Sequence, residues 1–314
     1  MTSFESISKD YRSGFVALIG RPNVGKSTLV NQLVGEKVAI TSPIAQTTRN
    51  RLKAILTTPT AQLVILDTPG IHKPHHLLGE RLVQSARNSI GEVDLVILIL
   101  DLSALPGKGD GFIINLLMKQ KIPVLVVLNK SDLIEGLNLE ERINEYKQFL
   151  EYSPWPVNCC SAITGNGCKE LVEEMIDSIP IGPQLYPPGM ISDQPEQILL
   201  AELIREQVLL HTREEIPHSV AVRIDRVDEI PLKRVQSKND FYTAILATVL
   251  VERKSQKGIL IGKGGNMLKT IGSGARQQMQ KLINGKVYLE LLVKVVPNWR
   301  SKPARLAELG YEGK

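Results

Sequence analysis

The stretch Gly20-Arg21-Pro22-Asn23-Val24-Gly25-Lys26-Ser27-Thr28 constrains this chain more than any other part of its sequence. It matches G-x-x-x-x-G-K-[ST], follows the apolar run 15–19, and precedes a stretch, 29–33, that reads as a helix. This order of strand, glycine turn and helix distinguishes a phosphate-binding loop from a chance match. The backbone N–H groups of such a loop surround phosphate oxygens, and the helix start adds positive potential. We therefore predict that these nine residues bind the phosphates of a nucleotide, with Lys26 at the β- and γ-phosphates and Ser27 on Mg²⁺.

The composition indicates a globular protein of two domains. The chain has 314 residues, of which 43% are hydrophobic and 23% charged, values ordinary for globular proteins. No apolar run approaches the roughly 20 residues of a membrane helix, and 1–12 lacks the apolar core of a signal peptide. Cys159, Cys160 and Cys168 lack the spacing of a disulfide framework or a zinc site. We expect a cytoplasmic protein with reduced thiols.

Apolar runs alternate with amphipathic stretches throughout residues 15–178. This alternation is typical of an α/β fold in which helices cover both faces of a mostly parallel sheet. The strands expected after the first are 52–57, 62–67, 93–101, 122–128 and 157–159, and the helices are 79–90, 111–119, 139–150 and 169–179.

A stretch dense in Pro and Gly, 180–190, followed by Pro195, predicts a linker. We therefore expect a nucleotide-binding domain at 1–180, a linker at 181–196 and a second domain at 197–314. In the second domain the expected helices are 196–210, 266–282 and 303–309, and the expected strands are 218–224, 242–252 and 287–296.

The two halves differ in charge. Residues 1–180 carry 18 Lys and Arg against 19 Asp and Glu, whereas 181–314 carry 20 against 14. Within the second half, 253–289 holds eight basic residues and no acidic one. This asymmetry favours a polyanion partner for the second domain over an ordinary solvated basic face.

Two motifs that close strands identify the nucleotide. Asp67-Thr68-Pro69-Gly70 offers a carboxylate that can hold Mg²⁺ through water and a Gly70 N–H that can contact the γ-phosphate. In Asn129-Lys130-Ser131-Asp132, the Asp132 carboxylate can accept hydrogen bonds from guanine N1–H and from the exocyclic amine that adenine lacks. Lys130 would lay its stem along the base, and Ser161-Ala162 would offer the Ala162 amide to guanine O6. The predicted ligands are GTP and GDP, with Asn129, Lys130, Asp132, Ser161 and Ala162 around the base.

A switch that senses the γ-phosphate is expected between the first helix and the second strand. The candidate is Ala45-Gln46-Thr47-Thr48-Arg49. We prefer Thr48 over Thr47 as the Mg²⁺ ligand beside Ser27 and Asp67, although the sequence does not separate the two. The remaining switch residues are Asp67, Thr68, Pro69, Gly70 and Ile71. His72, His75 and His76 follow, and a polar switch segment explains them more simply than a metal site does.

Gly262-Lys263-Gly264-Gly265 lies at the centre of the acid-free stretch, between a short apolar helix and the long helix 266–282. Such a G-x-x-G turn clamps a nucleic-acid backbone in KH domains, because glycine lets the sugar–phosphate chain approach the main chain closely. Lys269 and Arg276 lie seven residues apart on one helical face and extend the phosphate track. We predict RNA binding by Gly262, Lys263, Gly264, Gly265, Lys269 and Arg276. The strand order, two before this turn and one after, predicts an α+β fold of the type II KH arrangement.

These motifs resemble those of the Era family of translation-factor-related bacterial GTPases. The resemblance rests on the phosphate loop, on Gln46-Thr47-Thr48-Arg49, on Asp67-Thr68-Pro69-Gly70-Ile71-His72, and in the second domain on 241–253, 268–276 and 293–300. It covers all but about the first dozen residues.

The resemblance implies a P-loop GTPase domain followed by a KH domain. It further implies binding to the 3′ region of 16S ribosomal RNA, assistance in 30S subunit assembly, and peripheral association with the inner membrane. Ile71 stands where Ras-like GTPases have the glutamine that orients the attacking water, so we predict slow hydrolysis. In this group a K⁺ ion, held partly by the asparagine matching Asn23, can replace an arginine finger. Asn23 either does this or only shapes the loop. We expect a monomer.

Three alternatives differ in what they require. A tRNA-modifying GTPase would place this domain inside a helical one and end in a cysteine motif. A double GTPase would need a second phosphate loop, which 106–109 does not provide. A nucleotide-gated RNA-binding scaffold with incidental hydrolysis shares every residue with the GTPase interpretation, so this alternative stays open.

Overall fold

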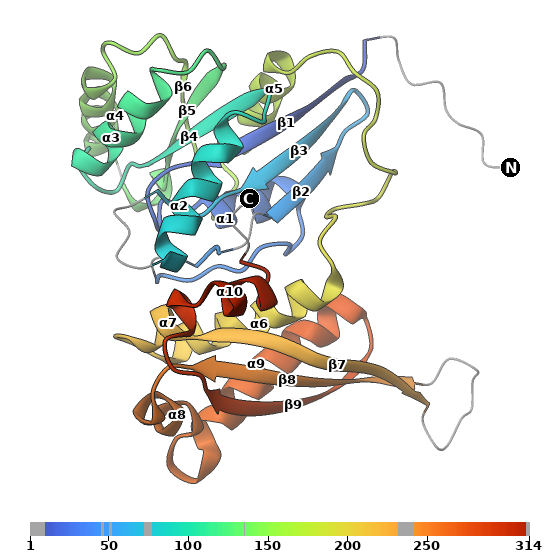
Figure 1. Ribbon diagram of the computed structural model, residues 1–314. Helices are drawn as coiled ribbons and strands as arrows, with labels where there is room; N and C mark the ends of the chain where they lie inside the picture. Colours follow the sequence, from blue (N-terminus) through green and yellow to red (C-terminus); the bar gives the residue numbers. More distant parts are fainter. Residues whose placement is uncertain are drawn as a thin grey trace, which may run out of the picture.

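The computed structural model describes residues 10–44, 47–49, 52–71, 77–134, 136–231 and 241–311. The chain forms a six-stranded and a three-stranded sheet, each with its own helices, drawn one above the other in Figure 1. The strands of the first sheet are β1 (Arg12–Ile19), β2 (Leu52–Thr57), β3 (Ala61–Asp67), β4 (Leu95–Asp101), β5 (Val124–Asn129) and β6 (Val157–Cys159). Its helices are α1 (Lys26–Val34), α2 (Leu77–Ile90), α3 (Lys108–Leu117), α4 (Leu137–Phe149) and α5 (Cys168–Ser178).

The first sheet has the order β2-β3-β1-β4-β5-β6, and all its neighbouring strands are parallel except β2 and β3. In β1, Val16 and Leu18 pack into a core with α1 and α5. The alternate residues Ala17 and Ile19 pack into a second core with α2, α3 and α4. Because both faces are covered, the strands are continuous apolar runs. The predicted mostly parallel α/β fold is confirmed.

The carboxyl ends of β1, β3, β5 and β6 lie at one edge of this sheet. The segments that follow them are 20–25, 68–71, 130–134 and 160–167. Parallel strands bring such segments together, and in open α/β sheets ligands bind at this edge.

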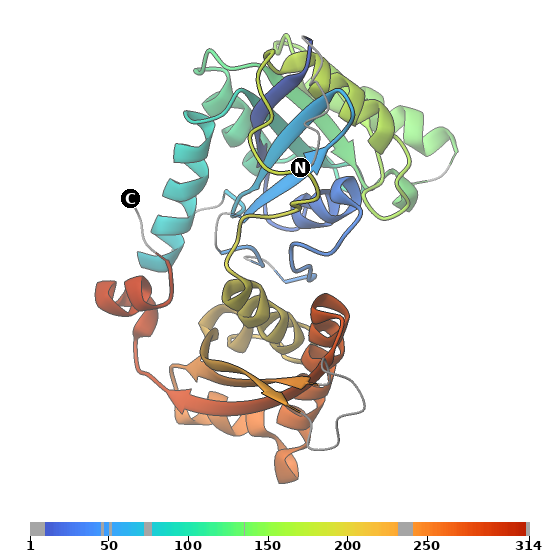
Figure 2. The same ribbon diagram turned by 90° about the vertical axis from the view of Figure 1, so that its right-hand side faces the viewer.

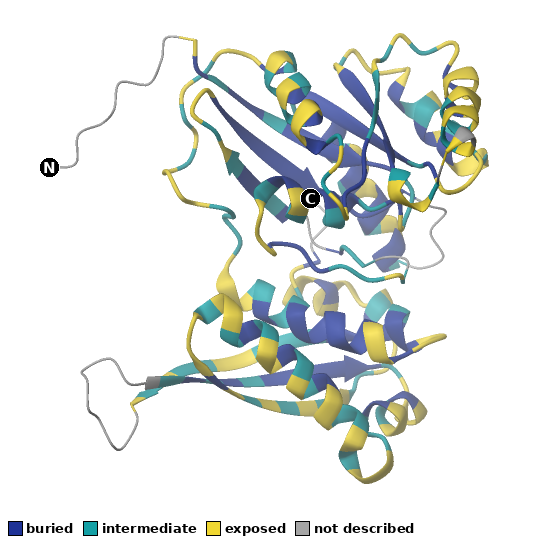
Figure 3. Ribbon diagram, turned by 180° about the vertical axis from the view of Figure 1, so that it is seen from behind, coloured by how far each residue is buried: buried dark blue, intermediate teal, exposed yellow. Residues whose placement is uncertain are grey.

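The second sheet has the order β7-β8-β9, with β7 and β8 antiparallel and β8 and β9 parallel. The strands are β7 (Ala221–Pro231), β8 (Phe241–Val251) and β9 (Lys286–Val295), and the helices are α6 (Glu196–His211), α7 (Ile216–Ser219), α8 (Lys254–Ile261), α9 (Asn266–Ile283) and α10 (Pro303–Glu308). Apolar residues of α6, α8 and α9 share one core with β8 and β9. Figure 3 shows buried stretches, in dark blue, on these helices and on the sheet beneath them. Two strands precede the glycine turn and one follows it, as predicted.

The strand expected at 218–224 is wrong in its first residues. His218 lies in α7, and the strand begins at Ala221 and continues to Pro231. Pro217 stands in the first turn of α7, where its fixed φ favours a helix. The Trp299 indole N–H also donates to Ser219 O at 2.8 Å. This contact joins residues 80 positions apart and leaves no local pattern in the sequence.

The two halves meet through α6 and through the C-terminal segment. Trp299, Leu306 and Tyr311 share a core with Leu78 and Leu82 of α2. Figures 1 and 2 show α10 beside α2, and α6 directly beneath the loops at the carboxyl edge of the first sheet. Residues 180–195, all described, connect the halves without a helix.

Candidate functional site

The loop between β1 and α1 depends on glycine at both ends. A Cβ on Gly20 would lie 2.5 Å from Ile99 O, and one on Gly25 would lie 2.2 Å from Asn129 Nδ2. Gly25 also has a φ of +98°, in the left-handed region that side chains disfavour. The sequence pattern therefore reflects close packing of this loop against β4 and against the end of β5.

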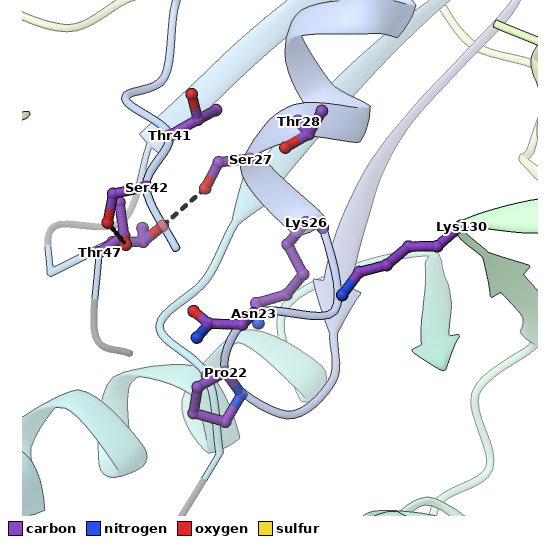
Figure 4. A pocket seen from close by; sticks show the side chains of 12 residues that line it. Pro22, Asn23, Lys26, Ser27, Thr28, Thr41, Ser42, Thr47 and Lys130 are labelled. Atoms are coloured by element: carbon purple, nitrogen blue, oxygen red, sulfur yellow. Dashed lines mark hydrogen bonds between the residues drawn. The ribbon is translucent and has the colours of Figure 1, made fainter. Parts of the chain in front are cut away.

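Lys26 folds back over the loop that precedes it. Its Nζ donates to Gly20 O at 3.2 Å and to Arg21 O at 2.8 Å. The side chain is buried, and burial lowers the pKa of Lys26 to about 8, although the Asp67 carboxylate opposes the shift. A phosphate in the pocket would stabilise the charged form. Figure 4 shows Lys26 in this pocket with Asn23 and Ser27.

Arg21 takes a different direction from the rest of the loop. Its Nε lies 2.7 Å from Asp110 Oδ1 of α3. The Arg21 side chain therefore pairs with α3, and the backbone of Arg21 forms part of the phosphate-binding loop. Val24 is buried in the core beside α1. The pocket is lined by Pro22, Asn23, Gly25, Lys26, Ser27, Thr28, Thr41, Ser42, Thr47, Thr48, Gly70 and Lys130.

Three oxygen-bearing side chains meet next to this loop. Ser27 Oγ lies 2.6 Å from Asp67 Oδ2 and 2.8 Å from Thr48 Oγ1, and Thr48 Oγ1 donates to Asp67 Oδ2 at 3.1 Å. The pKa of Asp67 is raised because the carboxylate is fully buried, although the two hydroxyl groups oppose the shift. Asp67 Oδ1 has no hydrogen-bond partner among the described residues. This arrangement offers several hard oxygen donors to a small cation.

The structure separates the two threonines that the sequence left open. Thr47 Oγ1 donates to Ile44 O at 2.6 Å and contacts Ser42 Oγ at 2.7 Å, within its own loop. Figure 4 shows the Ser42–Thr47 contact. Only Thr48 of the two reaches Ser27 and Asp67. Ala45 and Gln46 of the same motif lie outside the described residues.

The segment after β3 packs against the phosphate-binding loop. Thr68 Oγ1 donates to Leu18 O at 2.6 Å, and Ile71 N donates to Gly20 O at 3.2 Å. A Cβ on Gly70 would lie 2.7 Å from Pro22 N, and Pro69 lies between Thr68 and Gly70. The Ile71 side chain is 4% exposed and belongs to the core beneath α2. It presents no polar group that could orient water. His72, His75 and His76 lie outside the described residues.

Asn129 joins the phosphate-binding loop to the segment after β6. Its Nδ2 donates to Val24 O at 2.8 Å, and its Oδ1 accepts from Ala162 N at 2.9 Å. The Ala162 N–H, which we expect to donate to the base, already donates to Asn129 Oδ1. A base oxygen would have to share this donor. Asn129 therefore acts here as a structural link between the two loops.

The remaining base-site residues are arranged by short polar contacts. Ser161 Oγ donates to Asp132 Oδ1 at 2.5 Å, which orients a carboxylate whose residue is exposed. Lys130 adopts a φ of +71°, and its Nζ lies 2.5 Å from Asp101 Oδ2. Asp101 was missed in the sequence because an acidic residue ending a strand is not distinctive.

Asn23 contacts the switch loop. It has a φ of +63°, and its Nδ2 donates to Pro43 O at 2.8 Å. This contact ties the phosphate-binding loop to the segment that carries Thr48. Asn23 therefore shapes the loop, whether or not its Oδ1 also serves an ion.

The glycine turn of the second half has the backbone that its sequence predicts. Gly262, Gly264 and Gly265 have φ values of +72°, +60° and +80°. A Cβ on Gly262 would lie 2.9 Å from Met267 N. Lys263 and Gly264 are exposed at the tip between α8 and α9. The turn therefore presents bare backbone to solvent at the start of an 18-residue helix.

A groove runs from this turn between α9 and β9. It is lined by Gly265, Leu268, Lys269, Gly272, Ser273, Arg276, Tyr288, Leu289, Glu290 and Leu291. Lys269 and Arg276 thus share one groove, as their spacing predicts. The β9 side of the groove was missed, because only the folded sheet brings Tyr288 and Glu290 opposite α9.

Comparison with known proteins places both halves in recognised families. The family described as "50S ribosome-binding GTPase" matches residues 15–130, and the family described as "KH domain" matches residues 215–300. GTPase Era of Nostoc sp. (strain PCC 7120) is 55% identical over 303 residues, which are 96% of this chain and 90% of that protein. GTPase Era of Synechocystis sp. (strain PCC 6803) is 53% identical over 96% of this chain and 93% of its own length.

Two solved structures match the whole fold. One is Era in complex with MgGDPNP and nucleotides 1506–1542 of 16S ribosomal RNA, with 38% sequence identity and a TM-score of 0.89. The other is a point variant of Aquifex aeolicus Era bound to GDP·AlF₄⁻, with 38% identity and a TM-score of 0.88. Each alignment covers 96% of this chain and 99% of the other.

Proposed function

The chain belongs to the GTPase Era family and is a GTPase that carries a KH domain, and we propose that it binds and slowly hydrolyses GTP, binds the 3′ region of 16S ribosomal RNA through the KH domain, and assists 16S rRNA processing and 30S subunit assembly. One observation carries the GTP site. Asn129 ties the phosphate-binding loop to Ala162, the neighbour of Ser161, whose hydroxyl bonds to Asp132. Ser27, Thr48 and Asp67 meet beside the same loop. The neighbour solved with MgGDPNP and 16S rRNA nucleotides supports the ligands proposed here.

The division of labour follows the two sheets. We assign residues 1–180 to the GTP-binding domain, 181–196 to the linker and 197–314 to the KH-type RNA-binding domain. The family matches at 15–130 and 215–300 fall inside the two assigned domains.

Phosphoryl transfer in this pocket depends on positioning and charge. Lys26 would leave the carbonyl oxygens of Gly20 and Arg21 for the β- and γ-phosphates, and the loop amides would bind the phosphate oxygens. Ser27, Thr48 and Asp67 fit Mg²⁺, because all three side chains offer oxygen and the buried Asp67 Oδ1 has no hydrogen-bond partner in the described part of the chain. Bound Mg²⁺ neutralises charge on the β- and γ-phosphate oxygens.

Slow turnover follows from Ile71. Its apolar side chain is buried, so the attacking water must be placed by backbone groups or by a partner. We propose that K⁺ near Asn23 assists this step. The family resemblance supports this ion role, and the Asn23 contact with Pro43 supports the competing loop-shaping role.

The groove between α9 and β9 is the proposed RNA site. Lys263 and the turn backbone would bind phosphates, and Lys269 and Arg276 would continue that track. Glu290 supplies an acceptor opposite these cations, suited to the amino group of a base such as cytosine.

Purified protein should hydrolyse GTP at a low rate that rises when K⁺ replaces Na⁺, with ATP failing to compete. Equal competition by ATP would overturn the guanine assignment. A fast rate that does not change when K⁺ is exchanged for Na⁺ would exclude a role for the monovalent ion in hydrolysis. Asn23 would then only shape the loop.

The scaffold alternative differs from a GTPase switch in whether the bound nucleotide changes the affinity for RNA. RNA affinity should be compared for the 16S 3′-end oligonucleotide in the GTP-analogue, GDP and nucleotide-free states. A switch requires different affinities, because a ligand that binds both states equally shifts neither. Equal affinities would favour a scaffold with incidental hydrolysis.

We also propose a cytoplasmic monomer, and, on the family resemblance alone, peripheral association with the inner membrane. Among the described residues, no helix is long and apolar enough to cross a membrane. Cell fractionation at low and high salt tests the peripheral association, since surface-bound protein is released by salt.

A further inference from the structure

The segment that carries Thr48 is held by both halves of the molecule, and the residues on either side of Thr48 are bonded to the second half. We use the name switch segment for its described residues, 37–44 and 47–49. Ile40 is 4% exposed and belongs to the core of the second sheet, and Ile44 packs against the same core. The Asn31 side chain of α1 bonds to Val38 and Ala39 within the first half. Asn23 donates to Pro43 O, whereas Lys37, Thr41, Thr47 and Arg49 bond across to α6 and to residues 217–220.

Two adjacent charged residues of α6, Arg205 and Glu206, make the contacts of this helix with the switch segment. Glu206 is 2% exposed, and its carboxylate accepts from Thr41 N at 2.8 Å and from Lys37 Nζ at 2.6 Å. Arg205 is 0% exposed, and its guanidinium donates to Thr47 O while pairing with Glu202. Leu203 to Leu209 are all buried, so this part of α6 is enclosed and the charged side chains of Arg205 and Glu206 do not face solvent.

The second half binds the residues on both sides of Thr48. Thr47 O, one residue before it, is bound by Arg205. Arg49, one residue after it, is 3% exposed and donates to Val220 O at 2.5 Å and to Pro217 O at 2.9 Å. With both neighbours anchored, the Thr48 hydroxyl stays beside Ser27 and Asp67.

We propose that Arg205 and Glu206 are positioning residues for GTP: α6 of the RNA-binding half holds the switch segment so that Thr48 stands ready at the phosphate end of the pocket. This inference rests on the proposed function. Only a nucleotide with a γ-phosphate engages a switch threonine through Mg²⁺. The contacts of Arg205 and Glu206 therefore raise the affinity for GTP relative to GDP, since a contact that serves one state alone changes the ratio of the two affinities.

The test compares Arg205→Met and Glu206→Gln with the wild-type full-length chain. Affinities for a non-hydrolysable GTP analogue and for GDP are measured over a series of Mg²⁺ concentrations. Each variant should lose about tenfold in GTP-analogue affinity, within the usual range of coupling between sites, with GDP affinity unchanged. Arg205→Lys should recover part of the loss, because an ammonium group can still donate to Thr47 O.

Arg81→Ala is the matched control. Arg81 donates to Tyr311 O at 2.7 Å and so joins the two halves through a backbone oxygen. It has no direct bond to the switch segment, whose Arg49 interacts with the Tyr311 side chain. The Arg81→Ala variant should prefer the GTP analogue over GDP as strongly as the wild type does. An equal loss in this control would mean that the interface acts only by general stability.

A double-mutant cycle with Thr48→Ala provides a second measurement. Arg205→Met and Glu206→Gln should each cost little in the Thr48→Ala background, because the side chain that they position is absent. Additive losses would overturn the proposal, as would a wild-type GTP preference in both α6 variants. A wild-type chain that binds no guanine nucleotide would instead refute the proposed function.

Discussion

Single residues shape the proposed nucleotide site. The glycines of the phosphate-binding loop are required by contacts that a Cβ would violate, at 2.5 Å for Gly20 and 2.2 Å for Gly25. Asn129 links two loops, because it bonds both to Val24 and to Ala162. The carboxylate of Asp132, proposed to bind the base, accepts from the hydroxyl of Ser161.

Asp132→Asn should move base preference from guanine to xanthine. The variant replaces an acceptor by a group that presents a donor, while xanthine carries an oxygen where guanine carries its amine. The bond from the guanine amine, charge-assisted and worth about 1.5–3 kcal/mol, is lost, while the amide oxygen can still accept from N1–H. GTP affinity should therefore fall at least about tenfold. Competition of GTP and XTP for a fluorescent nucleotide measures the change. An unaltered preference would remove Asp132 from the base site.

At the scale of elements, each motif works because a strand or helix end presents it. The phosphate loop and the base loops follow parallel strands that end at one edge, and the glycine turn opens α9. The groove beside that turn pairs a helix with a strand, α9 with β9. Neither element forms the groove without the other.

Lys263→Asp together with Gly264→Asp should abolish RNA binding and leave GTP binding unchanged. The double change places carboxylates where phosphates are expected, and repulsion there should weaken binding beyond about a hundredfold at low salt. Gel shift with the 16S 3′-end oligonucleotide and nucleotide titration give the two readouts.

Ser301→Asp together with Lys302→Asp is the matched control for this experiment. Both residues are exposed outside the groove, and the two double variants change the net charge equally. The control should retain most of its RNA affinity. Persistent RNA binding by the Lys263/Gly264 variant would show that the basic stretch, and not the turn, binds RNA.

Over the whole molecule, one buried carboxylate joins two separate parts, the switch segment and α9. Glu206 Oε2 accepts from Lys37 and also from Gln278 Nε2 of α9 at 2.8 Å, while Oε1 accepts from Thr41 N. The packing of α6 on α9 is close, since a Cβ on Gly274 would lie 2.1 Å from Gln207 Oε1. Helix α9, which lines the proposed RNA groove, thus shares a hydrogen-bond acceptor with the switch segment.

Gln278→Met should reduce the effect of nucleotide on RNA affinity. The variant keeps the side-chain volume and removes the bond to Glu206, so the gain in RNA affinity on adding a GTP analogue should shrink by about threefold or more. RNA affinity without nucleotide should not change. Gln277→Met, at the exposed neighbouring position of α9, is the control. An undiminished nucleotide effect would exclude Gln278 from the coupling.

Contiguous residues were enough to predict the chemistry of each site. The phosphate loop, Asp67–Gly70, Asn129–Asp132 and the glycine turn are local patterns, and so is the alternation that predicts a parallel sheet. Their backbone conformations follow from glycine, chain direction and apolar period, which short stretches carry by themselves.

Contacts between distant residues decided the rest. Thr47 and Thr48 are equivalent in the sequence, and only the folded chain turns the second toward Asp67. The Arg205-Glu206-Gln207 interruption of an apolar helix was a visible signal, but its meaning lies in partners such as Thr41, 165 residues away. Such pairs leave no local period, because a buried charge is placed by the packing of both halves around it.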